Sequence, residues 1–111
     1  MTERISFKEF QKLDIRVGTV TDFKDHPNAD KLVLLQVDLG DETRQLVAGI
    51  KGHYTKEELV GKQIVVLCNL EPAMLRGEKS DGMLLAADDE KEGIISLLRP
   101  EKPVKNGTKV R

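Results

Sequence analysis

Residues Arg44 to Cys68 read RQLVAGIKGHYTKEELVGKQIVVLC, and the predicted fold depends on this stretch. Its two ends, Arg44–Ile50 and Ile64–Cys68, are rich in valine, leucine and isoleucine, as buried strands are. Between them, Tyr54–Gly61 is expected to form one short helix, because Thr55 suits the N-cap, acidic residues fill the first turn and a glycine ends it. The stretch therefore predicts a strand, a helix and a second strand, in that order.

Two further strands are predicted upstream. Leu13–Val20 alternates apolar and polar residues with period two, which indicates a half-buried strand. We expect its polar side to carry Asp14, Arg16 and Gly18, with the glycine marking a bend or a bulge. Lys31–Leu39 is the next strand and is joined to the Arg44–Ile50 strand by a short acidic turn, so the first three strands form a meander.

Downstream, Met83–Ala87 is predicted as the fifth strand and Gly93–Leu98 as a short sixth one. The residues from Asn69 to Leu85, NLEPAMLRGEKSDGMLL, are interpreted as a long loop between two buried strands. In the tail, the pair Asn106-Gly107 is flanked by valines and predicts a hairpin-like turn.

A short helix is predicted at the N-terminus. Ser6 followed by Glu9 makes a capping box, and Phe7, Phe10 and Leu13 recur at three-residue spacing. A helix this short is marginal by itself. We therefore expect its two phenylalanines to pack on the body of the subunit or on a partner chain.

Three strands, a helix after the third, and two more strands is the element order of an OB-fold, a closed five-stranded Greek-key barrel. The predicted fold class is all-β with short helices, in which the N-terminal helix and a C-terminal extension flank the barrel. At 111 residues the chain is expected to be one domain, residues 1–111. No signal peptide or bilayer-spanning segment is evident, so we expect a soluble, cytoplasmic protein without a membrane partner.

The charge balance limits the kinds of partner that fit. The chain has 18 Lys and Arg residues against 19 Asp and Glu residues, a net charge of -1, which argues against a broadly basic nucleic-acid binder. An anion site would have to be a local patch. In the long loop, Arg76, Lys79 and Ser80 all donate hydrogen bonds and suit an anionic partner. The alternative is an ordinary polar connection between strands.

The residue types give no argument for an enzyme, a metal or a cofactor. His26 and His53 do not stand at metal-ligand spacing with each other or with Cys68, which we expect to be buried and reduced. There is no phosphate-binding loop and no nucleophile elbow. Aromatic residues make up only 4% of the chain, too few to stack many unpaired bases. A nucleic-acid-binding barrel of this composition should instead read backbone and shape, as for structured RNA.

Four segments carry a family resemblance: residues 26–32, HPNADKL; 37–40, VDLG; 44–50, RQLVAGI; and 69–85, quoted above. Together they resemble the tRNA-binding domain at the C-terminus of bacterial methionyl-tRNA synthetases. The same domain occurs in endothelial monocyte-activating polypeptide II and in free-standing dimeric tRNA-binding proteins. The resemblance runs from Lys12 to Lys109. It implies an OB-fold that binds tRNA by its overall L-shape, and a homodimer whose interface includes Phe7 and Phe10.

The resemblance also assigns candidate site residues. A lysine at the start of strand two and the serine and methionine of a Ser-x-Gly-Met element contribute to tRNA binding in the free-standing proteins, and here they fall on Lys31, Ser80 and Met83. Asn28 and Arg76 join them from the same two loops. The implied function is that of a non-catalytic tRNA-binding factor, accessory to an aminoacyl-tRNA synthetase. With a net charge of -1, its affinity should be modest and salt-sensitive.

Two other functions stay open. An export chaperone of the CsaA type is similar in size, in dimeric OB architecture and in the segments Lys12–Arg16 and Pro103–Lys109, but would bind unfolded polypeptide in an apolar groove. An assembly module that recruits a synthetase is compatible with either function. The cation of Lys31 and the hydroxyl of Ser80 favour tRNA, because a peptide groove has no need for that pairing.

Overall fold

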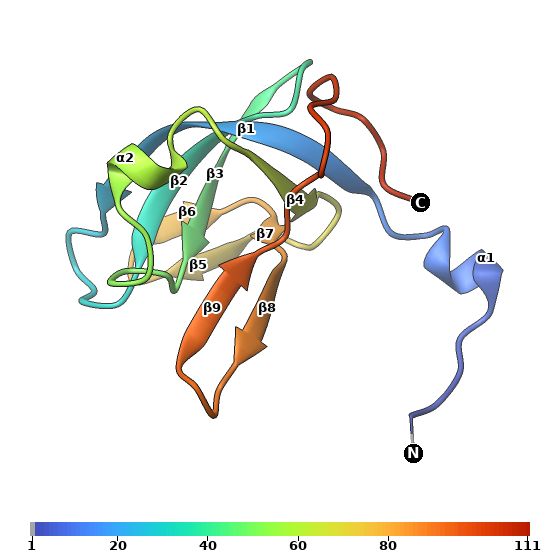
Figure 1. Cartoon of the computed structure of the whole chain (residues 1–111), viewed down its shortest axis with the longest axis horizontal. Helices are drawn as coiled ribbons and strands as arrows, with labels where there is room; N and C mark the ends of the chain where they lie inside the picture. Colours follow the sequence, from blue (N-terminus) through green and yellow to red (C-terminus); the bar gives the residue numbers. More distant parts are fainter. Residues whose placement is uncertain (1) are drawn as a thin grey trace.

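The central strand of the protein is β1, Ile15–Asp25, in a computed structural model that describes residues 2–111. It lies in a five-stranded antiparallel sheet of order β3-β2-β1-β4-β7, strongly curled in Figure 1. The other strands of the sheet are β2 (Val33–Asp38), β3 (Thr43–Ala48), β4 (Gln63–Leu67) and β7 (Met83–Leu84). Two hairpins extend from it, β5 (Ala73–Leu75) with β6 (Glu78–Ser80) and β8 (Ala86–Asp89) with β9 (Ile94–Leu97).

The curled sheet closes through the segment that follows β6. The Asp81 amide donates to the Gln45 carbonyl at 2.9 Å, and the Val47 amide donates to the Ser80 hydroxyl at 3.0 Å. These bonds join β3 to the end of the β5–β6 hairpin, because Gln45 and Val47 both belong to β3. The predicted OB-fold, with its meander, helix and closing strands, is confirmed.

The core fills the inside of the curled sheet. Its fully buried side chains come mainly from alternating positions of β1 to β4, as the period-two pattern predicts. The largest of them are Leu35, Leu39, Leu46, Leu59, Ile64, Val20, Val33, Val37 and Val66.

The second helix is shorter than predicted. It spans one turn, α2 (Lys56–Leu59), and its capping box is complete: Thr55 Oγ1 accepts from the Glu58 amide at 3.2 Å and Glu58 Oε1 accepts from the Thr55 amide at 2.9 Å. The chain then leaves the helix through Gly61, which has a φ of +88°. Burial of Leu59 attaches this single turn to the core.

The expected outward position of Gly18 is wrong. The glycine is buried, and a Cβ placed on it would lie 2.7 Å from Val37 Cγ1 and 2.8 Å from Leu39 Cδ2. The absence of a side chain allows β1 and β2 to approach closely at this point. The bulge is instead three residues further on, where the β1–β2 register shifts between Val20 and Asp22.

Two downstream expectations also need correction. The segment from Asn69 to Leu85 is not one loop, because it contains the β5–β6 hairpin and β7. The Asn106-Gly107 turn does not connect two strands of a tail hairpin. Instead the tail pairs with β1: the Gly107 amide donates to the Val17 carbonyl at 2.7 Å, and the Val17 amide donates to the Thr108 carbonyl at 2.9 Å.

The N-terminal helix, α1 (Phe7–Phe10), stands away from the barrel in Figure 1. Its predicted capping box is confirmed, since Ser6 Oγ accepts from the Glu9 amide at 3.1 Å and Glu9 Oε1 accepts from the Ser6 amide at 3.3 Å. None of its residues is buried. Among residues 2–111, no helix has the length and apolar character needed to cross a membrane.

Candidate nucleic-acid interface

The first part of the candidate site is the turn between β1 and β2, residues 26–32. His26 closes this turn: its amide donates to the Leu32 carbonyl at 3.1 Å, and its Nδ1 accepts from the Asn28 amide at 2.9 Å. Asn28 and Lys31 are both exposed on the turn. Lys31 lies two residues before β2 and not at its first position, since β2 begins at Val33.

The second part is the tip of the β5–β6 hairpin. Arg76 and Gly77 connect the two strands and both have positive φ, 53° and 90°, the combination of a type I′ turn. In residues 2–111, Arg76 is the sole non-glycine residue with positive φ. Asparagine or glycine would adopt this conformation with less strain, which costs an arginine on the order of 1–2 kcal/mol.

His26 joins the two parts. Its Nε2 donates to the Leu75 carbonyl at 2.8 Å, directly before Arg76, and its side chain is only 4% exposed. The bond places Asn28 and Lys31 of the turn next to the hairpin that carries Arg76. Residues about fifty positions apart in the sequence therefore contribute to one surface.

Ser80 does not present its hydroxyl on that surface. Its side chain is buried, and Oγ accepts from the Val47 amide at 3.0 Å while donating to the Gly82 carbonyl at 3.0 Å. The hydroxyl belongs to the group of hydrogen bonds between β3 and residues 80–82 that closes the barrel, called the seam below. Met83, by contrast, is 47% exposed on β7, beyond the seam.

The arginines and lysines differ in how far their charge is neutralised within the part of the chain that is described. Arg16 pairs with Asp14 at 3.0 Å, and Arg44 pairs with Glu42 at 2.8 Å, a hydrogen bond that lowers the pKa of the Glu42 carboxyl. Lys31, Arg76 and Lys79 have no carboxylate within 4.0 Å among residues 2–111. Their charges are available to an anion, whereas those of Arg16 and Arg44 are occupied.

Two positioning residues were not anticipated. The bond from His26 to Leu75 could not be inferred from the sequence without knowing that the hairpin lies beside the turn. Gln45 holds the other strand of the hairpin: its Nε2 donates to the Lys79 carbonyl at 2.9 Å and to Glu78 Oε1 at 3.2 Å. The His-Pro-Asn sequence did contain a local signal, because the bond from the Asn28 amide to His26 resembles an Asx-turn.

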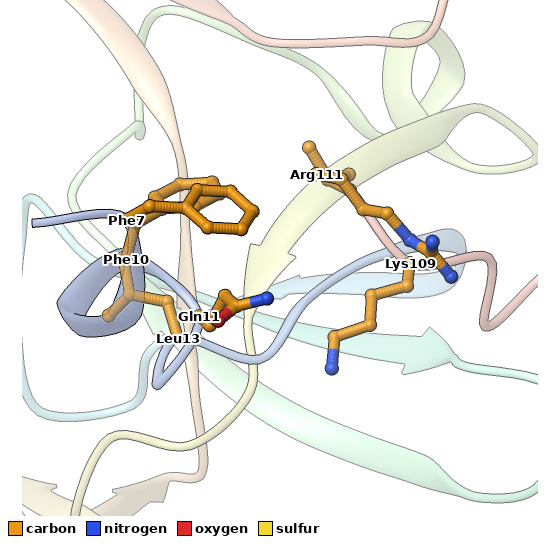
Figure 2. A pocket seen from close by; sticks show the side chains of 7 residues that line it. Phe7, Phe10, Gln11, Leu13, Lys109 and Arg111 are labelled. Carbon is orange, nitrogen blue, oxygen red and sulfur yellow. The ribbon is translucent and has the colours of Figure 1, made fainter.

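A separate apolar groove lies between α1 and the C-terminus (Figure 2). It has a volume of about 270 Å³ and is lined by Phe7, Phe10, Gln11, Leu13, Lys109, Val110 and Arg111. Phe7 is 72% exposed, and its ring lies over that of Phe10 with 6.4 Å between the centroids. The structure thus brings the two predicted interface residues together on one open face.

The fold and the site define a small OB-fold domain with exposed cations on a turn and a neighbouring hairpin. Residues 15–109 match the family model of the tRNA-binding domain, and the chain belongs to that family. It is 56% identical over 109 residues to a methionine–tRNA ligase of Thermococcus kodakarensis. That alignment covers 98% of this chain but 14% of the ligase, so the chain spans only a small part of the ligase's length.

Solved structures agree with this assignment. A MetRS-related protein from Pyrococcus horikoshii superposes with a TM-score of 0.91 at 34% identity, covering 99% of this chain and 100% of that one. The chaperone CsaA from Bacillus anthracis superposes with a TM-score of 0.86, also at 34% identity, covering 98% and 100%. The tRNA-binding domain and a chaperone therefore share this fold closely.

Proposed function

We propose that the chain is a non-catalytic, structure-specific tRNA-binding protein that acts in the cytoplasm as a homodimer, accessory to an aminoacyl-tRNA synthetase. The observation that carries the proposal is the surface formed by Asn28, Lys31 and Arg76, with unpaired cations on two loops held together by His26. Family membership supplies the class of ligand. The match to methionine–tRNA ligases supports the association with a synthetase.

The proposed contacts follow from exposure and chemistry. Lys31 and Arg76 neutralise phosphates, Asn28 donates from its side-chain amide, and Met83 supplies an apolar contact beyond the seam. Ser80 contributes by holding the seam that orients Met83. The positive φ of Arg76 supports its role, because strained backbone positions cluster at functional sites.

Dimerisation is proposed through α1 and the groove beside it. A one-turn helix with no buried residue has little to stabilise it in the monomer. Phe7, Phe10, Leu13 and Val110 form an apolar face there. A second copy docking the same face would bury these side chains and order the helix.

The second candidate function is peptide binding of the CsaA type. Exposed Met74 and Leu75 on β5, with Met83 nearby in sequence, offer flexible apolar side chains of the kind that bind varied peptides. The structural match to the CsaA chaperone favours this alternative. The two functions differ in salt dependence, because phosphate contacts release counterions and apolar contacts do not.

The test is to titrate the protein with folded tRNA, with single-stranded RNA of equal length and with an unfolded protein, each at several salt concentrations. Salt-steep binding to folded tRNA alone supports the proposal. Salt-insensitive binding to unfolded protein, with no preference for tRNA, would overturn it in favour of the chaperone.

Arg76→Asn tests the site within the same assay. Asparagine tolerates positive φ, so the hairpin should keep its shape while losing the charge. We expect weaker tRNA binding, and we expect the slope of the logarithm of the binding constant against the logarithm of the salt concentration to fall in magnitude by about 1. Lys91→Asn, at the acidic tip between β8 and β9, is the matched control and should bind as the parent does. An unchanged slope in Arg76→Asn would remove Arg76 from the site.

Phe10→Asp tests the dimer, since it places a charge on the apolar face. We expect a monomer by analytical ultracentrifugation. Lys8→Asp, on the same helix but outside the groove, should leave the dimer intact. A Phe10→Asp protein that stays dimeric would exclude this face as the interface.

A further inference from the structure

We propose that His26 is a positioning residue that acts as a neutral clamp between the β1–β2 turn and the β5–β6 hairpin. The inference rests on the proposed function for its effect on RNA. The clamp itself is a property of the free protein. It assigns a role to a side chain that makes no contact with the ligand, and it explains how two loops distant in sequence act as one RNA-binding surface.

The hydrogen bonds of the imidazole require one protonation state. A carbonyl oxygen only accepts, so Nε2 must carry the proton that bonds Leu75 at 2.8 Å. A backbone amide only donates, so Nδ1 must be unprotonated to accept from Asn28 at 2.9 Å. The ring is therefore the neutral tautomer with its proton on Nε2, and the polar atoms of the imidazole are both in use.

The clamp attaches β5, the more exposed strand of the hairpin, to the β1–β2 turn. All three residues of β5 are exposed, whereas β6 is held to β3 by Gln45 and Ser80. The bond from His26 reaches the last residue of β5, next to Arg76. The same ring fixes the Asn28 amide in the turn. Arg76 and the turn residues are thereby kept at a fixed spacing before the ligand arrives, which reduces the ordering cost of binding.

Two substitutions separate the two bonds. In His26→Asn, the side-chain oxygen stands where Nδ1 does and can accept from the Asn28 amide, as in an Asx-turn, but nothing reaches Leu75. In His26→Gln, the amide nitrogen stands near the position of Nε2 and can donate to Leu75, but the acceptor for Asn28 is lost. One variant keeps the turn and releases the hairpin, and the other does the reverse.

The first experiment measures the free protein by NMR relaxation and amide hydrogen exchange. We expect His26→Asn to raise the mobility of residues 73–79 while the Asn28 amide stays protected, and His26→Gln to show the opposite pattern. If His26→Asn does not fold, His26→Gln alone tests the clamp, through the loss of protection at the Asn28 amide. A hairpin that is unchanged in His26→Asn, or a turn unchanged in His26→Gln, would overturn the clamp.

The second experiment measures tRNA affinity. We expect His26→Asn to weaken binding roughly threefold to tenfold, the effect of losing one hydrogen bond. In that background Arg76→Ala should cost less than it does in the parent, while Lys31→Ala should cost the same, because only the hairpin has been released. An equal Arg76→Ala penalty in both backgrounds overturns the positioning role. A parent protein that binds no tRNA contradicts the proposed function instead, and the relaxation data still decide the clamp.

Discussion

Replacing Ser80 with alanine removes a hydroxyl that serves two backbone groups at the barrel seam. The Val47 amide loses its acceptor and the Gly82 carbonyl loses its donor, both at 3.0 Å in the parent. A buried polar group left without a partner costs about 1–3 kcal/mol. With two such groups, we expect the free energy of unfolding to fall by about 2–6 kcal/mol, a large share of the roughly 5–15 kcal/mol typical of a domain.

The assay is urea unfolding of the parent and of Ser80→Ala, followed by circular dichroism, beside a tRNA titration under conditions in which both proteins are folded. Ser96→Ala is the matched control, because Ser96 is exposed on β9, and it should change stability by less than about 0.5 kcal/mol. We expect Ser80→Ala to lose stability by the amount above. A Ser80→Ala protein as stable as the parent but weaker in tRNA binding would show that the hydroxyl contacts RNA and would refute the seam argument.

Three further results are expected. Gly18→Ala should lower the free energy of unfolding by about 1–3 kcal/mol, because the new Cβ would lie less than 3.0 Å from Val37 and Leu39. Gly49→Ala is the control and should change the free energy of unfolding little, because the nearest atom to its Cβ is 3.9 Å away. Equal stabilities of the two variants would contradict this. Burial raises the pKa of the Cys68 thiol, so iodoacetamide should label it at neutral pH only after unfolding, and rapid labelling of the native protein would refute its burial. The hydrogen bond from Arg44 lowers the pKa of the Glu42 carboxyl, so the pair stabilises the folded protein above the carboxyl's unfolded pKa, and this stabilisation is lost as the pH falls through the folded pKa. Glu42→Gln should therefore lose less stability in acid than the parent does. Equal losses would count against the pair.

The features that sequence reasoning predicted correctly depend on local signals. Alternating apolar and polar residues over Leu13–Val20 marked the start of β1, because each side of a strand sees one environment. Ser6 with Glu9 marked the first helix, since a capping box is complete within four residues. Thr55 as N-cap, the acidic residues after it and Gly61 marked the second. Placing these elements in order was enough to give the OB-fold.

The features that were missed depend on contacts between distant segments. Gly18 follows the outward pattern of its strand, but the close approach of Val37 and Leu39 buries it. Arg76-Gly77 turned out to be a type I′ turn even though an arginine is seldom found at positive φ. The tail pairs with β1 across about ninety residues, which no local pattern around Asn106 could indicate.

The Ser-x-Gly-Met element shows why a sequence motif predicts this fold more firmly than its function. Ser80 and Asp81 bond Val47 and Gln45, which stand two residues apart on β3, so the spacing of the element is set by barrel closure. Gly82 has a φ of +129°, and a Cβ there would lie 3.1 Å from Leu46 Cδ2 and 3.2 Å from the Leu67 carbonyl oxygen. A barrel closed in this way needs the hydroxyl at the first position of the element and the glycine at the third, whether the protein binds RNA or peptide. The residues that can distinguish the two functions are therefore exposed ones outside these hydrogen bonds, above all Arg76 at the tip of the hairpin.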